Sequence, residues 1–381
     1  MRICFVALNS YDLLVRRPIP RHCGGAERQQ ELLARSLVDR GHQVSFVCWN
    51  FGQSDREKID GIVVYRTRER DAGLPGLRFW GRWTDLCRAL HRADADVYYQ
   101  QCADELTGQV GLWARAHRRR FVFAAASNAD CDPALPNLRT WRERVLYRRG
   151  LRLANAHICQ TRWQREQFLR HFGICSEVIP SIGPNPRRSE RGALDRHGGC
   201  MWVGRVAPVK RFEWLIELAG RVPEQVFHAV GASNQESAYA DALVPRARGL
   251  SNIRVHGRVG RSALDAMYSE CRALICTSRW EGFPTTFLEA WSHGVPVVST
   301  VDPDGVIARH GLGAVAVDVS GLAAALRALL GDTERWAAAS CNARRYYLEN
   351  HAVERVLPRF ESLFADLGRR GAYAVASPRV D

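Results

Sequence analysis

The segment Arg279-Trp-Glu-Gly-Phe-Pro-Thr-Thr-Phe-Leu-Glu-Ala290 decides the fold. It follows an apolar run at 273–277, whose length and composition are those of a buried strand. A helix that begins near Pro284 places Glu281 in the preceding loop and Glu289 on the second helical turn. The segment therefore predicts a strand, a loop and a helix in this order, the basic unit of an α/β fold.

The same segment carries groups suited to a phosphorylated sugar. Backbone amides after Gly282 point along the axis of the expected helix and can bind phosphate oxygens. The carboxylates of Glu281 and Glu289 are acceptors for sugar and ribose hydroxyls. The alternative interpretation is a loop glutamate and a solvated helix glutamate with no ligand.

A second charged segment, Val203-Gly-Arg-Val-Ala-Pro-Val-Lys-Arg211, lies between an expected strand at 200–203 and a helix at 212–218. Gly204 allows a ligand to approach the backbone closely. Arg205 and Lys210 then flank a helix start, which predicts an anion site suited to a diphosphate. Lys58 and Lys210 are the only lysines among the 54 basic residues, so a lysine in this place is notable. The alternative is a surface turn with incidental cations.

The rest of the chain repeats the alternation of strand and helix. Strands are expected at 2–8, 44–49, 62–66, 97–100, 121–126 and 157–160, and again at 226–230, 253–256 and 297–299. Between the two series, residues 179–192 are rich in Pro, Gly and Ser, which is typical of a linker. Continuously apolar strands indicate parallel sheets covered on both faces, and their ligands bind at the carboxyl ends of the strands. Two α/β units with a cleft between them follow from this pattern.

A third motif, Gly24-Gly25-Ala26-Glu27, opens the first long helix. With the other two it gives the chain a resemblance to glycosyltransferase family 4, in order and spacing over nearly the whole sequence. The resemblance implies a GT-B fold, in which two Rossmann-like parallel-sheet domains face each other across a cleft. It also implies an acceptor-side domain at 1–182, a donor-binding domain at 183–352 and a last helix within 353–381 that crosses back to the first domain.

The resemblance also assigns roles at the donor site. Arg205 and Lys210 would neutralise the donor diphosphate, and Glu281 would hold hydroxyls of the donor sugar. Glu289 would bind the ribose. Further donor contacts would come from Gly204, Gly282, Phe283, Pro284 and Thr285, from Gly24 and Gly25, and, at the nucleobase, from His256, Gly257 and Arg258.

The chain departs from the family after the strand at 121–126, where many members have a histidine. The sequence there is Ala126-Ser-Asn-Ala-Asp-Cys-Asp132. Asn128 and Asp130 are the candidates for contact with the donor sugar or the acceptor hydroxyl. Acceptor loops are expected at 9–23, 70–85 and 127–140.

The net charge of +14 is concentrated in the first half of the chain. Residues 1–185 carry 29 Lys and Arg against 19 Asp and Glu, a net charge of +10. The densest run, 139–152, has an apolar stripe at near-helical spacing among its arginines. It predicts either a solvated helix face or a helix that contacts anionic membrane. Motifs of nucleic-acid readers are missing, and so are CxxC pairs, a signal peptide and apolar runs of about 20 residues. We therefore expect a cytoplasmic protein, at the inner face of the membrane if that contact forms.

The resemblance implies a retaining glycosyltransferase that uses a UDP- or GDP-sugar. The fixed cations would take the role of a metal, so we expect it to need neither a metal nor a bound cofactor. Its acceptor would be glycosyl or lipid-linked. One alternative is a sugar-nucleotide epimerase or phosphorylase of the same fold, although a phosphorylase with a pyridoxal-bound lysine would have to use Lys58, in a polar loop. The other is a non-catalytic basic protein that binds a membrane or a ligand.

Overall fold

The structure is a computed structural model that describes residues 1–21, 24–74, 78–185, 198–233 and 237–369. Its contacts divide the chain into two compact units. The first unit contains Met1–Arg16, His22–Ile182 and Val356–Asp381, and the second contains Arg17–Arg21 and Gly183–Arg355. The second half of the expected linker, 186–192, lies outside the described residues.

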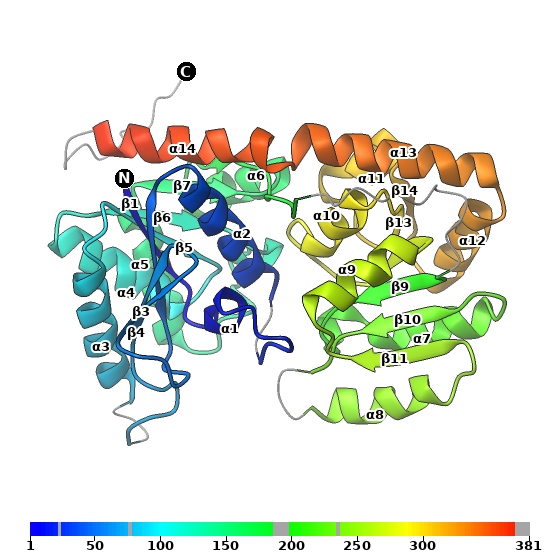
Figure 1. Cartoon of the computed structure of the whole chain (residues 1–381), viewed down its shortest axis with the longest axis horizontal. Coiled ribbons are helices and arrows are strands. Elements are labelled where there is room, and N and C mark those ends of the chain that lie inside the picture. The colour runs from blue at the N-terminus through cyan, green and yellow to red at the C-terminus, as the bar shows by residue number, and fades with distance from the viewer. Residues whose placement is uncertain (22–23, 75–77, 186–197, 234–236, 370–381) are drawn as a thin grey trace. The chain divides into compact units, whose positions relative to one another are not determined.

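The strands of the first unit form one sheet in the order β3-β4-β2-β1-β5-β6-β7-β8 (Figure 1). They are β1 (Arg2–Val6), β2 (Gln43–Cys48), β3 (Arg56–Ile59), β4 (Ile62–Arg66), β5 (Val97–Gln101), β6 (Arg120–Ala124), β7 (Ala156–Cys159) and β8 (Glu177–Val178). Adjacent strands are parallel as predicted, except that β3 and β4 are antiparallel. The sequence analysis overlooked β3. Asp60 and Gly61, with φ of 46° and 87°, form the tight turn that joins the two strands.

Helices accompany this sheet. They are α1 (Tyr11–Leu14), α2 (Gly25–Asp39), α3 (Arg78–Ala93), α4 (Glu105–Ala116), α5 (Trp141–Leu153), α6 (Arg162–Phe172) and α14 (Val353–Arg369). Helix α3 occupies part of the expected acceptor loop at 70–85, so that expectation was wrong for residues 78–85. Its apolar residues Phe79, Trp83, Leu86 and Leu90 recur at helical spacing, and Leu86 and Leu90 are buried.

Helices α4 and α5 touch backbone to backbone. A Cβ atom on Gly108 would lie 2.3 Å from the carbonyl oxygen of Leu146, and one on Gly150 would lie 2.3 Å from that of Thr107. Only glycine fits at these two positions, because each facing group is a main-chain carbonyl that cannot rotate away. The position of α5 is therefore fixed by its neighbour.

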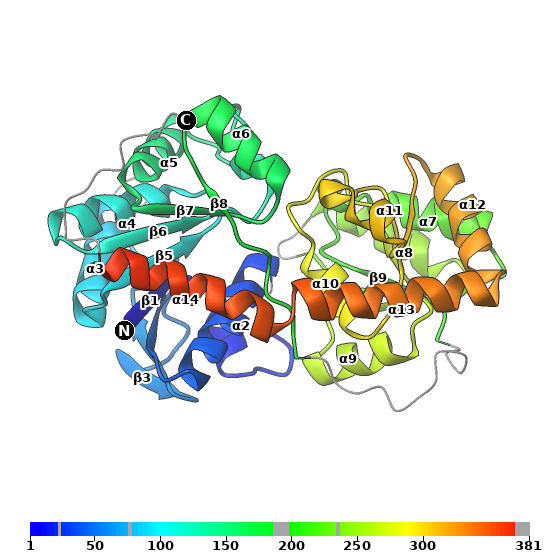
Figure 2. The same cartoon turned by 90° about the horizontal axis from the view of Figure 1, so that it is seen from above.

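Helix α14, the last helix among the described residues, packs within the first unit (Figure 2). Its side chains Phe360 and Phe364 are buried, and both rings contact the ring of Tyr99 on β5, with centroids 6.4 and 6.5 Å away. Residues from both ends of the sequence thus share one core.

The strands of the second unit form a parallel sheet in the order β11-β10-β9-β12-β13-β14. They are β9 (Cys200–Val203), β10 (Phe227–Val230), β11 (Ile253–Gly257), β12 (Ala273–Cys276), β13 (Val297–Ser299) and β14 (Gly313–Val315). The helices are α7 (Phe212–Arg221), α8 (Ala238–Arg248), α9 (Arg261–Glu270), α10 (Thr285–Ser292), α11 (Val306–His310), α12 (Val319–Leu330) and α13 (Thr333–Asn350).

Successive residues of these strands point to opposite faces and enter different cores. Trp202 and Ile275 pack on one face with α7, α8 and α12, whereas Met201 and Leu274 pack on the other with α9, α10 and α13. A sheet buried on both faces can offer a ligand only its edges and strand ends. The predicted α/β class with two parallel-sheet, Rossmann-like domains is confirmed.

Candidate active site

The two charged segments of the second unit lie after the neighbouring strands β9 and β12 and are tied together. The amide of Arg279 donates to the carbonyl of Val209 over 2.8 Å. The hydroxyl of Thr277 donates to the carbonyl of Lys210 over 2.6 Å and accepts the indole N–H of Trp202 over 3.0 Å. These bonds hold both segments at the carboxyl ends of the strands, where open α/β sheets bind ligands.

Lys210 and Glu281 form an ion pair between Nζ and Oε1. Their side chains are 24% and 16% exposed, so the pair is largely shielded yet still open to a ligand. The side chain of Lys210 passes Gly204, whose absent Cβ would lie 3.8 Å from Cδ. Arg205 is exposed beside them. The sequence analysis did not predict this ion pair between the two charged segments.

Helix α10 begins at Thr285 with Pro284 as its N-cap, and Glu289 lies on its second turn, as predicted. Pro284 has no side-chain acceptor to cap the first amides, and uncapped helix starts favour anions. The loop before it is buried at Gly282 and Phe283. The ring of Phe283 lies 4.8 Å from that of His351, which anchors the loop.

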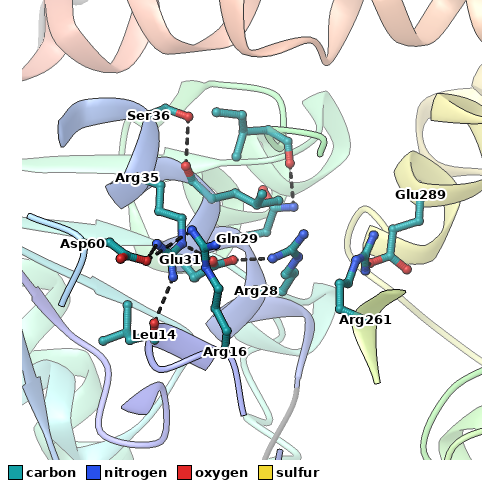
Figure 3. A network of polar contacts seen from close by, with 12 residues as sticks. Leu14, Arg16, Arg28, Gln29, Glu31, Arg35, Ser36, Asp60, Arg261 and Glu289 are labelled. Carbon is teal, nitrogen blue, oxygen red and sulfur yellow. Dashed lines mark hydrogen bonds and ion pairs between the residues drawn. The ribbon is translucent and has the colours of Figure 1, made fainter. Parts of the chain in front are cut away.

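Glu289 is buried and bound on both oxygens. Arg261, the first residue of α9, pairs with Oε1, and the hydroxyl of Tyr268 donates to Oε2 over 3.2 Å (Figure 3 shows the pair with Arg261). Arg261 also contacts Asp265 at 2.8 Å. Burial alone would lower the pKa of Arg261, but Glu289 and Asp265 raise it above its usual value. The sequence analysis missed Arg261 and Tyr268, because Glu289 lies 28 and 21 residues away from them.

The segment expected to receive the nucleobase lies at the end of β11. His256 Nε2 is 2.9 Å from Nδ1 of His228 on β10. Burial, together with His256 and Arg254, lowers the pKa of His228. Arg258 donates to the carbonyl of Ser233 over 2.7 Å. Gly257, with φ of 67°, ends the strand.

Gly231 joins three of these strand ends, although sequence analysis did not single it out. Its amide donates to the carbonyl of Gly257 over 2.7 Å, while the amide of Gly204 donates to Val230 over 3.0 Å. Its φ is 128°, and a Cβ there would lie 1.9 Å from the carbonyl oxygen of Gly204. Gly204 and Gly257, both predicted as site residues, therefore both contact Gly231, a position that only glycine can occupy.

In the first unit, Gly24 is the N-cap of α2 and Gly25 its first residue. This helix carries the polar network of Figure 3. Glu31, 4% exposed, pairs with both Arg28 and Arg35. Arg35 extends the network to Asp60 at 2.8 Å. None of these partners of α2 was expected from sequence.

Asp130 has a structural position. It is fully buried, and its Oδ2 accepts the amides of Ala126 and Ser127 over 2.7 and 3.1 Å. Burial raises its pKa to about 6. Asn128 accepts a hydrogen bond from Gln164 over 3.1 Å. Asp130 has no exposed surface, and its carboxylate holds the loop after β6. Contact of Asn128 or Asp130 with the donor sugar or the acceptor hydroxyl stays a prediction.

The described residues were searched for metal-binding groups and for membrane-spanning helices. Within them, His, Cys, Asp and Glu do not gather in groups of three or more that could hold a metal ion. A separate search of the same residues finds no helix with the length and apolar character needed to cross a membrane.

Comparison with solved structures identifies the fold. Sucrose-phosphate synthase from Thermosynechococcus elongatus has a TM-score of 0.76 at 17% identity, covering 96% of this chain and 98% of that one. HepE from Anabaena, in complex with UDP and glucose, has a TM-score of 0.75 at 17% identity, covering 96% and 99%. Both comparisons show the GT-B fold.

Sequence comparison then gives the family. Residues 24–181 match the family described as "Glycosyl transferase 4-like domain", and residues 198–332 match "Glycosyl transferases group 1". An uncharacterized glycosyltransferase of Methanocaldococcus jannaschii is 23% identical over 305 residues, which are 73% of this chain and 77% of that protein. The chain belongs to the GT-B glycosyltransferases and is a transferase.

Proposed function

We propose that the protein is a retaining, metal-independent transferase of glycosyltransferase family 4. It moves a sugar from a UDP- or GDP-sugar to an acceptor hydroxyl. The ion pair of Lys210 and Glu281, beside Arg205 and the start of α10, is the observation that carries this proposal. A UDP-sugar is the first donor to test, because HepE is described with UDP and glucose.

The charges of the site account for the proposed bond breaking. As the bond from sugar to phosphate breaks, negative charge grows on the leaving diphosphate. This charge is stabilised by Arg205, Lys210 and the first amides of α10. Because these groups are already oriented toward it, no reorganisation of solvent is needed during the reaction. The leaving phosphate takes the proton of the acceptor hydroxyl, which then attacks the same face of the sugar. Positive charge fixed in the protein thus has the role that a divalent metal has in other transferases.

The two glutamates orient the donor in this mechanism. In the free enzyme, Glu281 forms an ion pair with Lys210. When the donor binds, its phosphate pairs with the ammonium group of Lys210, and Glu281 accepts hydrogen bonds from sugar hydroxyls. Glu289 accepts the ribose hydroxyls, and its direction is set by Arg261 and Tyr268. His256, Gly257 and Arg258 lie at the end of β11, the segment proposed to receive the base.

A panel of nucleotide sugars tests the donor. We expect one of them to raise the melting temperature, because a ligand that binds the native state stabilises it. The same donor should be hydrolysed slowly, and a screen of glycosyl and lipid-linked acceptors should then reveal transfer. Retention requires the product to keep the anomeric configuration of the donor in NMR spectra. Metal independence requires full activity in EDTA.

Matched variants separate this proposal from its alternatives. Lys210→Met and Glu281→Gln should lose transfer but keep their fold, whereas Lys58→Met changes the other lysine, exposed on β3, and should remain active. Conversion of the nucleotide sugar without an acceptor would identify an epimerase, and phosphorolysis of a glycan would identify a phosphorylase. If no nucleotide sugar bound or reacted, a non-catalytic binding protein would replace the proposal.

A further inference from the structure

Helix α5 exposes large apolar side chains to solvent. Trp141 is 77% exposed and Val145 is 55% exposed. They are one helical turn apart and therefore lie on the same side. The opposite side of α5 is buried through Tyr147, Gly150 and Leu151. The apolar residues of α5 thus lie on two opposite sides of the helix. Packing in the core explains the buried side but not the exposed one.

The outer side of α5 continues as a basic surface. Arg148, Arg149 and Arg152 are exposed on the following turns, and at 100° per residue they fall around the same side as Trp141 and Val145. The one acidic residue of α5, Glu143, is turned to the start of the helix. Its carboxylate accepts the amides of Arg139 and Thr140 over 2.6 and 3.0 Å.

Helix α3 adds a second exposed tryptophan near the start of α5. Trp80 is 63% exposed and stacks on Trp83, with ring centroids 6.1 Å apart. The adjoining ring of Phe79 lies under the guanidinium of Arg142, 4.0 Å from its centroid. Because Arg142 follows Trp141 in sequence, this contact brings the aromatic cluster of α3 to the start of α5.

We propose that this surface docks the enzyme on an anionic lipid bilayer. We call it the Trp-Arg surface; its residues are Trp80, Trp141, Val145, Arg148, Arg149 and Arg152. Indole rings favour the headgroup level of a bilayer, where an apolar ring and a polar N–H are both accommodated. Arginines beside them attract anionic headgroups.

Two further observations favour a bilayer as the partner. Residues 1–185 carry a net charge of +10, which attracts an anionic surface in general. Such an attraction does not require a specific protein or nucleic-acid sequence in the partner. The close contact of α5 with α4 at Gly108 and Gly150 holds the Trp-Arg surface in place from beneath. Binding therefore needs no prior folding of the helix. The proposal does not depend on the donor chemistry.

Vesicle sedimentation of the full chain tests the docking. We expect binding to phosphatidylcholine vesicles that contain phosphatidylglycerol, weakening as salt is added, and little binding to pure phosphatidylcholine. Loss of one arginine should weaken binding by about five-fold. The triple change Arg148→Gln, Arg149→Gln and Arg152→Gln should therefore weaken it more than ten-fold, and Trp141→Ser with Val145→Ser should weaken binding at every salt concentration.

Helix α6 provides the matched control. Leu169 is 56% exposed there, near Arg165 and Arg170, so Leu169→Ser with Arg165→Gln and Arg170→Gln removes similar groups from another surface. A circular dichroism melt of each variant confirms that both units are folded. The proposal is wrong if the control loses as much vesicle binding as the α5 variants. It is also wrong if neutral vesicles bind equally well, or if the α5 changes abolish binding to duplex DNA but not to vesicles.

Discussion

Replacing Gly231 with alanine tests whether the strand ends of the second unit position the donor site. A φ of 128° costs a residue with a Cβ about 1–3 kcal/mol. The new methyl would lie 1.9 Å from the carbonyl oxygen of Gly204, whereas real Cβ contacts are longer than 3.0 Å. The end of β9 or β10 must therefore move by about 1 Å, and such overpacking costs about 1–3 kcal/mol more.

The two contributions give a loss of about 4 kcal/mol in the free energy of unfolding. For a domain of this size, each kcal/mol lowers the melting temperature by about 2–4 °C, so we expect a decrease of about 10 °C. Because Gly204 adjoins Arg205, nucleotide binding should also weaken. Circular dichroism melts with and without UDP measure both effects.

Gly220 on α7 is the control. No atom lies within 4 Å of the Cβ that alanine would add there, so Gly220→Ala should be neutral or stabilise the helix by up to about 1 kcal/mol. If Gly231→Ala melts and binds UDP as the wild-type protein does, the strand ends are not held in the way described. Equal losses in both variants would refute the steric explanation.

Three further predictions concern individual charges. Lys210→Met should reduce the turnover number by about 10²–10³-fold with a smaller effect on donor KM, which steady-state kinetics would show; a change in KM alone would contradict its role at the leaving group. Arg261→Met should leave Glu289 buried without its cation, destabilise the protein by about 3 kcal/mol and raise donor KM, and unchanged values in both assays would refute this. Asp130 has a folded pKa of about 6 against its usual 3.8, so its contribution to stability is complete at low pH and lost as the pH rises through 6, by about 3 kcal/mol. The Asp130→Asn melting temperature should therefore decline less than that of the wild-type protein from about pH 4 to pH 7, and parallel curves would contradict the burial of a charge.

The sequence predicted the elements that rest on local pattern. The strand before Arg279 and the helix after Pro284 were found because apolar runs and a helix start are short-range signals. The α/β class followed from their repetition. Helix α3 and the Asp60-Gly61 turn also had local signals, a helical apolar spacing and a turn dipeptide, that were not used.

Other features depend on contacts between distant residues. Arg261 reaches Glu289 only after α9 and α10 pack together, and Gly231 matters only because the backbone of Gly204 lies against it. Asp130 was a candidate for contact with the donor sugar or the acceptor hydroxyl because it follows the strand at 121–126, where many members of the family have a histidine. Only packing reveals that its carboxylate is enclosed by its own loop.

The packing of α14 has a consequence for synthesis. Phe360 and Phe364 complete a core whose other members, such as Tyr99, leave the ribosome much earlier. At about 5–20 residues per second, the 173 residues of Gly183–Arg355 take roughly 10–35 seconds to translate. During that interval the apolar surface that α14 will cover is open to chaperones or to other nascent chains. The second unit, whose residues emerge almost consecutively, can finish folding before the first one does.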